Sequence, residues 1–86
     1  MKLEFTQEAL KDLETLDKTM LTFFEQHFEK ILVMPPRKEM KYGIPFHKEE
    51  VTKQARIIYD ITGETITIIR CFSTHKEYEK WYKTYR

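Results

Sequence analysis

The stretch that decides the fold is ARIIYDITGETITIIRCF, residues 55–72. Its two parts, residues 55–61 and 64–72, are rich in β-branched and aromatic side chains, so each part predicts a β-strand. Thr62-Gly63 lies between them and predicts a tight turn. The sequence therefore predicts a β-hairpin, which the rest of the chain has to cover.

The register of this hairpin stays open at this point, and with it the relation between Arg56 and Arg70. A two-residue loop places Arg56 opposite Ile69. A three-residue loop places Arg56 directly opposite Arg70, and two facing cations require an anion between them, either a carboxylate or a phosphate. The two arginines are interpreted either as charges that protect a sheet edge or as parts of an anion-binding site.

The chain before the hairpin predicts one strand and two helices. Residues 2–5 alternate polar and apolar side chains, as a half-buried strand does. Thr6 is a suitable N-cap for a helix over residues 7–17. Residues 17–19 provide a break, and a second helix is expected over residues 20–33. Its apolar side chains recur at helical spacing and form one stripe, made of Leu21, Phe24, Phe28 and Ile31.

Two further segments complete the order of elements. Pro35-Pro36 ends the second helix, and residues 40–47 predict a bent strand in which Pro45 favours a sheet edge or a bulge. Ser73 or Thr74 caps a short helix that continues to Tyr85. His27 is expected at the surface or boundary of the second helix rather than as a ligand.

The order strand, helix, helix, three strands, helix predicts a single α+β domain over residues 1–86. We expect an N-terminal strand and a helical hairpin packed on a small, mostly antiparallel sheet, with a short C-terminal helix. The expected core is Leu10, Leu13, Phe24, Phe28, Ile57, Tyr59, Ile66 and Ile68.

Composition narrows the class of protein. Eighty-six residues suffice for one small domain. The longest apolar run, residues 31–34, is too short to span a membrane, and the first residues lack the apolar core of a signal peptide. We therefore expect a cytoplasmic protein without a membrane partner. Residues 1–34 carry four lysines against seven acids, and residues 35–86 carry eleven basic residues against seven acids, so the C-terminal half is suited to a polyanion.

The sequence holds no metal or cofactor signature. The three histidines are far apart, no HxxxH or HExxH motif occurs, and the single cysteine excludes a site made of several cysteines. Cys71 and His75 could form a nucleophile pair, but an apolar strand favours a buried, inert thiol at Cys71. We expect neither a metal nor another cofactor.

Bases and aromatics gather in the C-terminal half instead. We expect them to be either a nucleic-acid site or, for the aromatics, the packing of the last helix. The members are Lys41, His47, Lys48, Lys53, Arg56, Arg70, His75, Lys76, Tyr78, Trp81 and Tyr82.

Taken together, several segments resemble the RelE/ParE toxin superfamily. They are Phe5-Thr6-x-x-Ala9, a charged helix with Asp12-Leu13, and residues 55–61 followed by 65–70. The superfamily's Tyr-Arg-hydrophobic-hydrophobic-Tyr strand is matched by residues 55–59, with Ala55 replacing the first Tyr. Residues 74–78 resemble the Thr-His-x-x-Tyr ending of HigB-like members. The likeness covers nearly the whole chain, although residues 35–53 follow no family pattern.

The resemblance implies the toxin of a type II toxin–antitoxin system that cleaves messenger RNA on the ribosome, without a metal, through attack by the ribose 2′-OH. It implies Arg56 on the scissile phosphate, His75 or Lys76 as the basic residue after the last strand, and Tyr78 or Tyr82 for base stacking or proton transfer. His47 is a further candidate for the general base, because imidazole titrates near neutrality.

From the resemblance and the charges we expect Arg56, Arg70 and His75 to converge on one phosphate. Lys41, Lys48, Lys53, Lys76 and Trp81 are the other RNA-binding candidates. The implied partners are an antitoxin, the ribosome and mRNA. The alternatives are a ParE-like inhibitor of DNA gyrase, which is not a nuclease, and a non-catalytic binding domain of the same fold.

Overall fold

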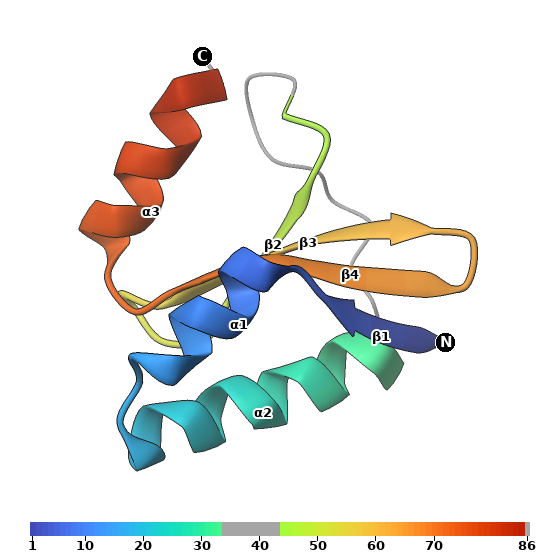
Figure 1. Ribbon diagram of the computed structural model, residues 1–86, viewed down its shortest axis with the longest axis horizontal. Helices are drawn as coiled ribbons and strands as arrows, with labels where there is room; N and C mark the ends of the chain where they lie inside the picture. Colours follow the sequence, from blue (N-terminus) through green and yellow to red (C-terminus); the bar gives the residue numbers. More distant parts are fainter. Residues whose placement is uncertain (34–43, 86) are drawn as a thin grey trace.

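The computed structural model describes residues 1–33 and 44–85. In this part of the chain, three α-helices and four β-strands follow one another in an order that agrees with the prediction (Figure 1). The elements are β1 (Lys2–Phe5), α1 (Gln7–Glu14), α2 (Lys18–Val33), β2 (His47–Glu50), β3 (Arg56–Thr62), β4 (Thr65–Phe72), α3 (His75–Tyr82) and a closing 3-10 turn (Lys83–Tyr85).

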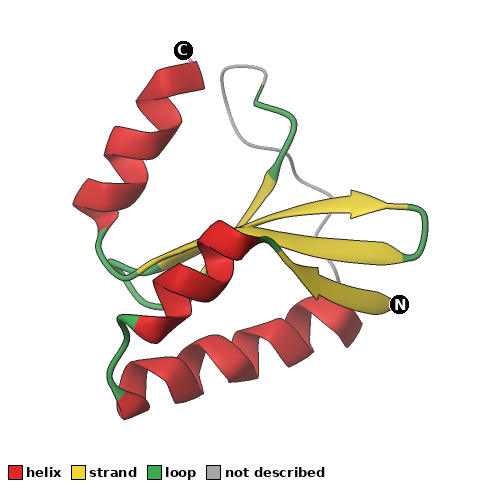
Figure 2. Cartoon of the chain, in the orientation of Figure 1, coloured by secondary structure: helices red, strands yellow, loops and turns green. Residues whose placement is uncertain are grey.

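The four strands of the described residues form one sheet in the order β1-β4-β3-β2. β1 runs parallel to β4, and the other two pairs are antiparallel. The helices α1 and α2 cover one face of the sheet, and α3 packs against the other, so helices and strands form separate layers (Figure 2). The predicted α+β class, with its helical hairpin and mostly antiparallel sheet, is confirmed.

Short-range hydrogen bonds fix the helix ends. The Thr6 hydroxyl accepts from the Ala9 backbone amide at 3.0 Å, as expected of an N-cap. α1 ends at Glu14, three residues earlier than predicted, because the amides of Thr15 and Leu16 turn back to carbonyls three residues before them. Asp17 then caps α2 through the Met20 amide at 2.8 Å, so this helix begins two residues earlier than predicted.

The β3–β4 hairpin adopts neither of the two predicted registers. Thr62 pairs with Thr65, and the two-residue loop between them contains Gly63 at a φ of +59°, a conformation that suits glycine. The register then shifts between Ile58 and Tyr59. As a result Arg56 faces Phe72 and not Ile69 or Arg70.

This shift is a β-bulge at Ile69, and it changes which face the following residues occupy. Ile66 and Ile68 point to the helical hairpin, and beyond the bulge Cys71 points there as well. Arg70 and Phe72 therefore lie on the α3 side. The Thr6 hydroxyl donates to the Ile69 carbonyl at 2.8 Å, so the residue that caps α1 also holds the bulge.

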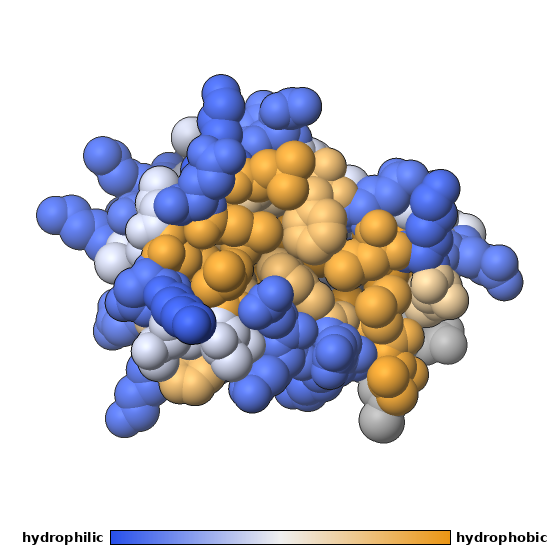
Figure 3. Space-filling model, turned by 60° about the horizontal axis from the view of Figure 1, so that its bottom comes forward, coloured by the Kyte–Doolittle hydropathy of each residue, from blue (hydrophilic) through white to orange (hydrophobic). Residues whose placement is uncertain are grey.

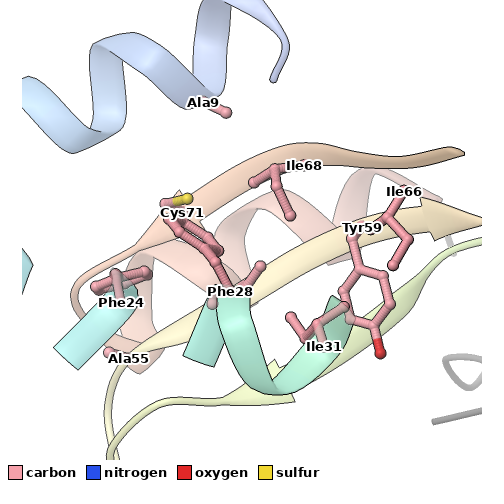
Figure 4. Packing of buried hydrophobic residues seen from close by; sticks show 10 residues of the cluster. Ala9, Phe24, Phe28, Ile31, Ala55, Tyr59, Ile66, Ile68 and Cys71 are labelled. Atoms are coloured by element: carbon pink, nitrogen blue, oxygen red, sulfur yellow. The ribbon is translucent and has the colours of Figure 1, made fainter. Parts of the chain in front are cut away.

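The main core lies between the helical hairpin and the sheet (Figure 4). Seven of the eight predicted core residues are buried there or packed against it. Leu10 is the exception, because it is 44% exposed. The side of α1 that meets β4 carries Ala9 and Leu13 together with the carboxylate of Asp12, which leaves Leu10 at the rim.

The region before β3 departs most from the prediction. Residues 40–43 of the expected strand lie outside the described residues, residues 44–46 are not in a strand, and β2 begins only at His47. β2 is nevertheless an edge strand, as Pro45 suggested. Thr74 caps α3 through the Glu77 amide, and a 3-10 turn replaces the last part of the expected helix.

The side of the molecule formed by the helical hairpin of α1 and α2 has apolar side chains at its surface. Figure 3 brings this side forward and shows a band of apolar side chains bordered by hydrophilic ones. Leu10 of α1 and Phe23 and Val33 of α2 are among the exposed large hydrophobics. No helix within residues 1–33 and 44–85 is long and apolar enough to cross a membrane.

Candidate functional site

A cluster of cationic and aromatic side chains surrounds Tyr78 on the α3 side of the sheet. The Lys48 Nζ lies 5.9 Å and the Arg56 Cζ 5.8 Å from the centre of the Tyr78 ring. The rings of His75 and Tyr82 lie at 5.6 and 5.1 Å. These five residues, which we call the Tyr78 cluster, come from β2, β3 and α3, and all are candidates that the sequence suggested.

Arg56 is the most rigidly held member of the cluster. Its side chain is only 9% exposed, and Nη1 donates to the carbonyls of Thr52, Lys53 and Ala55 at 3.0–3.1 Å. These carbonyls belong to the turn between β2 and β3, so the guanidinium pins that turn. Because carbonyls are neutral, they fix the position of Arg56 and leave its positive charge in place.

Two donors of Arg56 are not used by these carbonyls. Nη2 lies 3.7 Å from the carboxylate of Glu50, whose side chain is 64% exposed. Nε is buried and has no hydrogen-bond partner among the described residues. An exposed glutamate is weakly held at this distance, so it can move away and leave Nη2 to an incoming anion.

Tyr78 lies at the centre of the cluster and is nearly buried. Burial raises the pKa of its phenol, the Tyr82 phenol raises this pKa further, and the Arg56 charge partly opposes both effects. The hydroxyl is therefore protonated at neutral pH and able to donate a proton. The Thr74 cap and a hydrogen bond from the His75 amide to Gln54 fix the start of α3 beside the β2–β3 turn.

His47 lies on the opposite face of the sheet and is not part of this cluster. It stacks on Tyr59 at 5.4 Å between ring centres, and Tyr59 belongs to the core under the helical hairpin. Lys48 is the next residue of β2 and therefore points to the other side. His47 is thus separated from Arg56 and Tyr78 by the sheet itself, which removes it as a base for chemistry at this cluster.

Arg70, on the same side of the sheet, is bound by a carboxylate. Its Nε and Nη2 donate to the two carboxylate oxygens of Asp12 at 2.8 and 3.0 Å. The hydrogen bond to Asp12 raises the pKa of the guanidinium. The same carboxylate accepts from the Cys71 amide at 2.9 Å. Of the two arginines, Arg70 is therefore the one that a carboxylate neutralises, and the convergence of Arg56, Arg70 and His75 on one phosphate stays a prediction.

The other candidates are distributed along the C-terminal half. Lys53 is exposed in the β2–β3 turn and Lys76 on α3. Trp81 contacts Phe72 and Phe46 at 5.7 and 6.0 Å between ring centres. Lys41 lies outside the described residues.

Cys71 is buried under the helical hairpin. Burial raises the pKa of its thiol to about 12, and Asp12 adds to this effect. The thiol therefore stays protonated, and the sheet separates it from His75. The inert thiol, rather than the nucleophile pair, agrees with the structure.

Sequence reasoning missed two ionic contacts, one between α2 and β2 and one between α1 and β4. Glu49, 6% exposed, accepts from Lys30 at 2.9 Å and lies 2.6 Å from His27 Nδ1. The sequence did contain a signal for this contact. His27 and Lys30 lie one helical turn apart beside the apolar stripe, and Glu49 points to the face opposite to that of its strand neighbour Lys48. The other missed contact is Asp12 with Arg70, and its signal was a carboxylate on the apolar side of α1.

One protein family matches most of the chain in sequence. The sequence model of the family described as the ParE toxin of type II toxin–antitoxin system, parDE, matches residues 3–78. No curated protein matches the chain in sequence.

Solved structures share the fold at low identity. The intact RelBE toxin–antitoxin complex of E. coli matches with a TM-score of 0.71 and 19% identity, covering 81% of this chain and 92% of that one. The RelBE2 toxin–antitoxin complex of Mycobacterium tuberculosis matches with a TM-score of 0.71 and 24% identity, covering 81% and 93%. The RelB–RelE antitoxin–toxin complex of Methanococcus jannaschii matches with a TM-score of 0.72 and 15% identity, covering 92% and 98%.

Proposed function

The chain belongs to the ParE toxin family of type II toxin–antitoxin systems, and we propose that it acts as a metal-independent, ribosome-dependent mRNA endoribonuclease of the cytoplasm. One observation carries this proposal: Lys48, Arg56 and His75 surround the protonated Tyr78 within 6 Å of its ring. This group supplies positive charge, a titratable imidazole and a proton donor at one place.

The reaction that suits these groups is cleavage by the neighbouring ribose hydroxyl. The 2′-oxygen attacks the phosphorus, its proton passes to a base, and the bond from phosphorus to the 5′-oxygen breaks as that oxygen takes a proton from an acid. The products are a 2′,3′-cyclic phosphate and a free 5′-hydroxyl. We assign the base to His75, which is 42% exposed, and the acid to Tyr78.

Arg56 and Lys48 would stabilise the phosphorane, which carries more negative charge than the starting phosphodiester. A guanidinium held by carbonyls does not have to reorganise when that charge develops. Glu50 would leave Nη2 as the phosphate enters, so part of the binding energy is spent on separating a weak, exposed ion pair.

The test is a cleavage assay with purified protein and translating ribosomes, in which new message ends are mapped. Arg56→Ala should lower the cleavage rate by roughly 10²–10³, and Tyr78→Phe and His75→Gln by roughly 10²–10⁴. Lys11→Ala, an exposed lysine of α1, is the control.

Arg56 also holds the β2–β3 turn, so its variant needs a check of folding by circular dichroism. Tyr78→Phe keeps the ring and its contacts, and it therefore tests the hydroxyl without that complication. Full activity in both Tyr78→Phe and His75→Gln would contradict the assignment of acid and base.

The second candidate is inhibition of DNA gyrase, and the match to a ParE family model favours it. A gyrase supercoiling assay beside the ribosome assay separates the two. Inhibition of supercoiling with intact messages would replace the nuclease proposal. A protein that does neither would be the non-catalytic domain of this fold.

The partner that we propose is a cognate antitoxin, because the similar structures are toxin–antitoxin complexes. The basic C-terminal half would be neutralised by an acidic segment that folds on binding. Expression of the chain alone should arrest growth, and expression of the adjacent reading frame should relieve the arrest. Normal growth at high expression of the folded protein would contradict the toxin activity.

A further inference from the structure

A second feature lies beside the Tyr78 cluster, and we propose that it is a nucleobase-binding subsite for the nucleotide next to the scissile phosphate. This placement of the nucleotide rests on the proposed nuclease function. The feature is an open pocket of about 320 Å³ between β4 and α3, lined by Arg70, Phe72, Glu77, Lys80 and Trp81. We call it the aromatic pocket. Its size lies at the lower end of ligand pockets, as a single flat ring requires.

The floor of the aromatic pocket consists of two aromatic rings and a guanidinium. The Phe72 and Trp81 rings lie 5.7 Å apart at an angle of 47°. The Arg70 guanidinium lies over Phe72, with Cζ at 4.7 Å from the ring centre. Aromatic rings and guanidinium planes are the surfaces on which unpaired RNA bases stack. One such contact strengthens binding roughly five- to 150-fold.

The charges around the pocket favour a base over a phosphate. Asp12 neutralises Arg70 through two hydrogen bonds, and Glu77 and Lys80 add one charge of each sign. A phosphate therefore gains little here compared with the Tyr78 cluster, where Arg56 keeps its charge. An uncharged ring with a polar edge fits a neutral, aromatic pocket better.

The polar groups at the rim give this subsite a preference. A carboxylate accepts hydrogen bonds from the exocyclic amino group of a base, and Glu77 is the carboxylate that lines the pocket. Cytosine and adenine carry such a group, whereas uracil has a carbonyl in its place. We therefore infer that the aromatic pocket binds cytosine or adenine more tightly than uracil.

Phe72 connects this pocket to the proposed site of cleavage. Its ring lies 6.2 Å from that of Tyr78 and 5.7 Å from that of Trp81, so it forms a wall common to both. A strand with its phosphate at Arg56 and Tyr78 can place an adjoining base against Trp81 and the Arg70 guanidinium that covers Phe72. The pocket would then set which base is preferred beside the cut.

Trp81 is the only tryptophan of the chain, so its fluorescence reports directly on the pocket. We would titrate the folded protein with 5′-AMP, 5′-CMP and 5′-UMP, and with ribose 5-phosphate as the base-free control. We expect AMP and CMP to quench Trp81 at lower concentration than UMP, and ribose 5-phosphate to have no effect. Glu77→Gln should reduce the difference between CMP and UMP at least severalfold, whereas Glu64→Gln in the β3–β4 turn should not change it.

Two results would overturn the subsite. Equal responses to nucleotides and ribose 5-phosphate would show that no base is recognised. Quenching by N-acetyl-leucinamide but not by the nucleotides would assign the pocket to an apolar side chain of a partner protein. Because the assay requires no cleavage, its outcome is independent of the ribosome assay. Base-dependent quenching in a protein that leaves messages intact would reject the nuclease and retain the base-binding pocket.

Discussion

The two faces of the sheet differ in how a buried charge is partnered. On the face that the helical hairpin covers, the buried carboxylate of Glu49 is matched by Lys30 and His27 and lies beside the apolar core. On the α3 face, Arg56 is equally buried, but neutral carbonyls hold it. Its one carboxylate contact among residues 1–33 and 44–85 is Glu50, exposed and 3.7 Å away. The buried charge of Glu49 is therefore compensated by cations, whereas Arg56 retains its positive charge in a buried position, which costs stability.

Arg56 on β3 and Arg70 on β4 show the same difference in partners within the β3–β4 hairpin. Arg70 forms a bidentate pair with Asp12, which neutralises it and ties α1 to β4. Arg56 lies under Tyr78 with its charge still available. The residue type is the same in both, so the partner determines the role: a carboxylate makes a structural arginine, and carbonyls make one that can serve an anion.

The largest effect should come from the hairpin face. Phe28→Ala should lower the free energy of unfolding by about 3–5 kcal/mol, because Phe28 is 6% exposed and contacts the rings of Phe5 and Phe24. Chemical denaturation measures the change. Phe23→Ala, on the same helix but 41% exposed, should cost under about 1 kcal/mol. Equal losses in the two variants would contradict the assignment of the buried stripe.

What the sequence predicted about this core, and what it did not, follows from the range of the interactions. The stripe of α2, the Thr6 cap and the strand arms depend on residues within a few positions of one another, and they were predicted correctly. The hairpin register was not, because the loop is Gly63-Glu64 rather than Thr62-Gly63 and a bulge at Ile69 then shifts the pairing again. The Thr6 hydroxyl that bonds to the Ile69 carbonyl is 63 residues away in the chain.

The candidate site divides in the same way. The Tyr78 cluster contains five of the residues that the sequence suggested, since a basic and aromatic end is visible in composition. The pairing of Arg70 with a carboxylate was not predictable, because its partner Asp12 lies 58 residues earlier. The sequence also suggested His47 as the general base, but this residue lies on the other face of the sheet. Alternation already sets His47 and Lys48 on opposite faces, but which of them faces α3 depends on the pairing of β2 with β3.

A smaller effect should separate the two adjacent glutamates of β2. Glu49→Gln should cost about 1–3 kcal/mol, because it weakens charge-assisted hydrogen bonds to a buried oxygen. Glu50→Gln should cost about 0–1 kcal/mol, as expected of an exposed pair. Thermal unfolding of the two variants provides the measurement. A greater loss for Glu50→Gln would reverse the comparison between the compensated and the charged face.

The smallest effect concerns the pair of Asp12 and Arg70, and it tests whether Arg70 is structural. The Arg70 side chain is 30% exposed and that of Asp12 is 17% exposed, so solvent screens the pair in part. Asp12→Asn and Arg70→Gln, alone and combined, should give a coupling energy of about 0.5–1 kcal/mol in a double-mutant cycle. Glu14→Gln, an exposed residue of the same helix, should couple to Arg70→Gln by under about 0.3 kcal/mol.

The Asp12→Asn variant also tests whether Arg70, unlike Arg56, is neutralised by a carboxylate. Removing Asp12 frees a second cation, so Asp12→Asn should strengthen non-specific RNA binding and make it more sensitive to salt. A coupling near zero, with RNA binding unchanged in Asp12→Asn, would mean that Asp12 does not neutralise Arg70, and the contrast between the two arginines would fail.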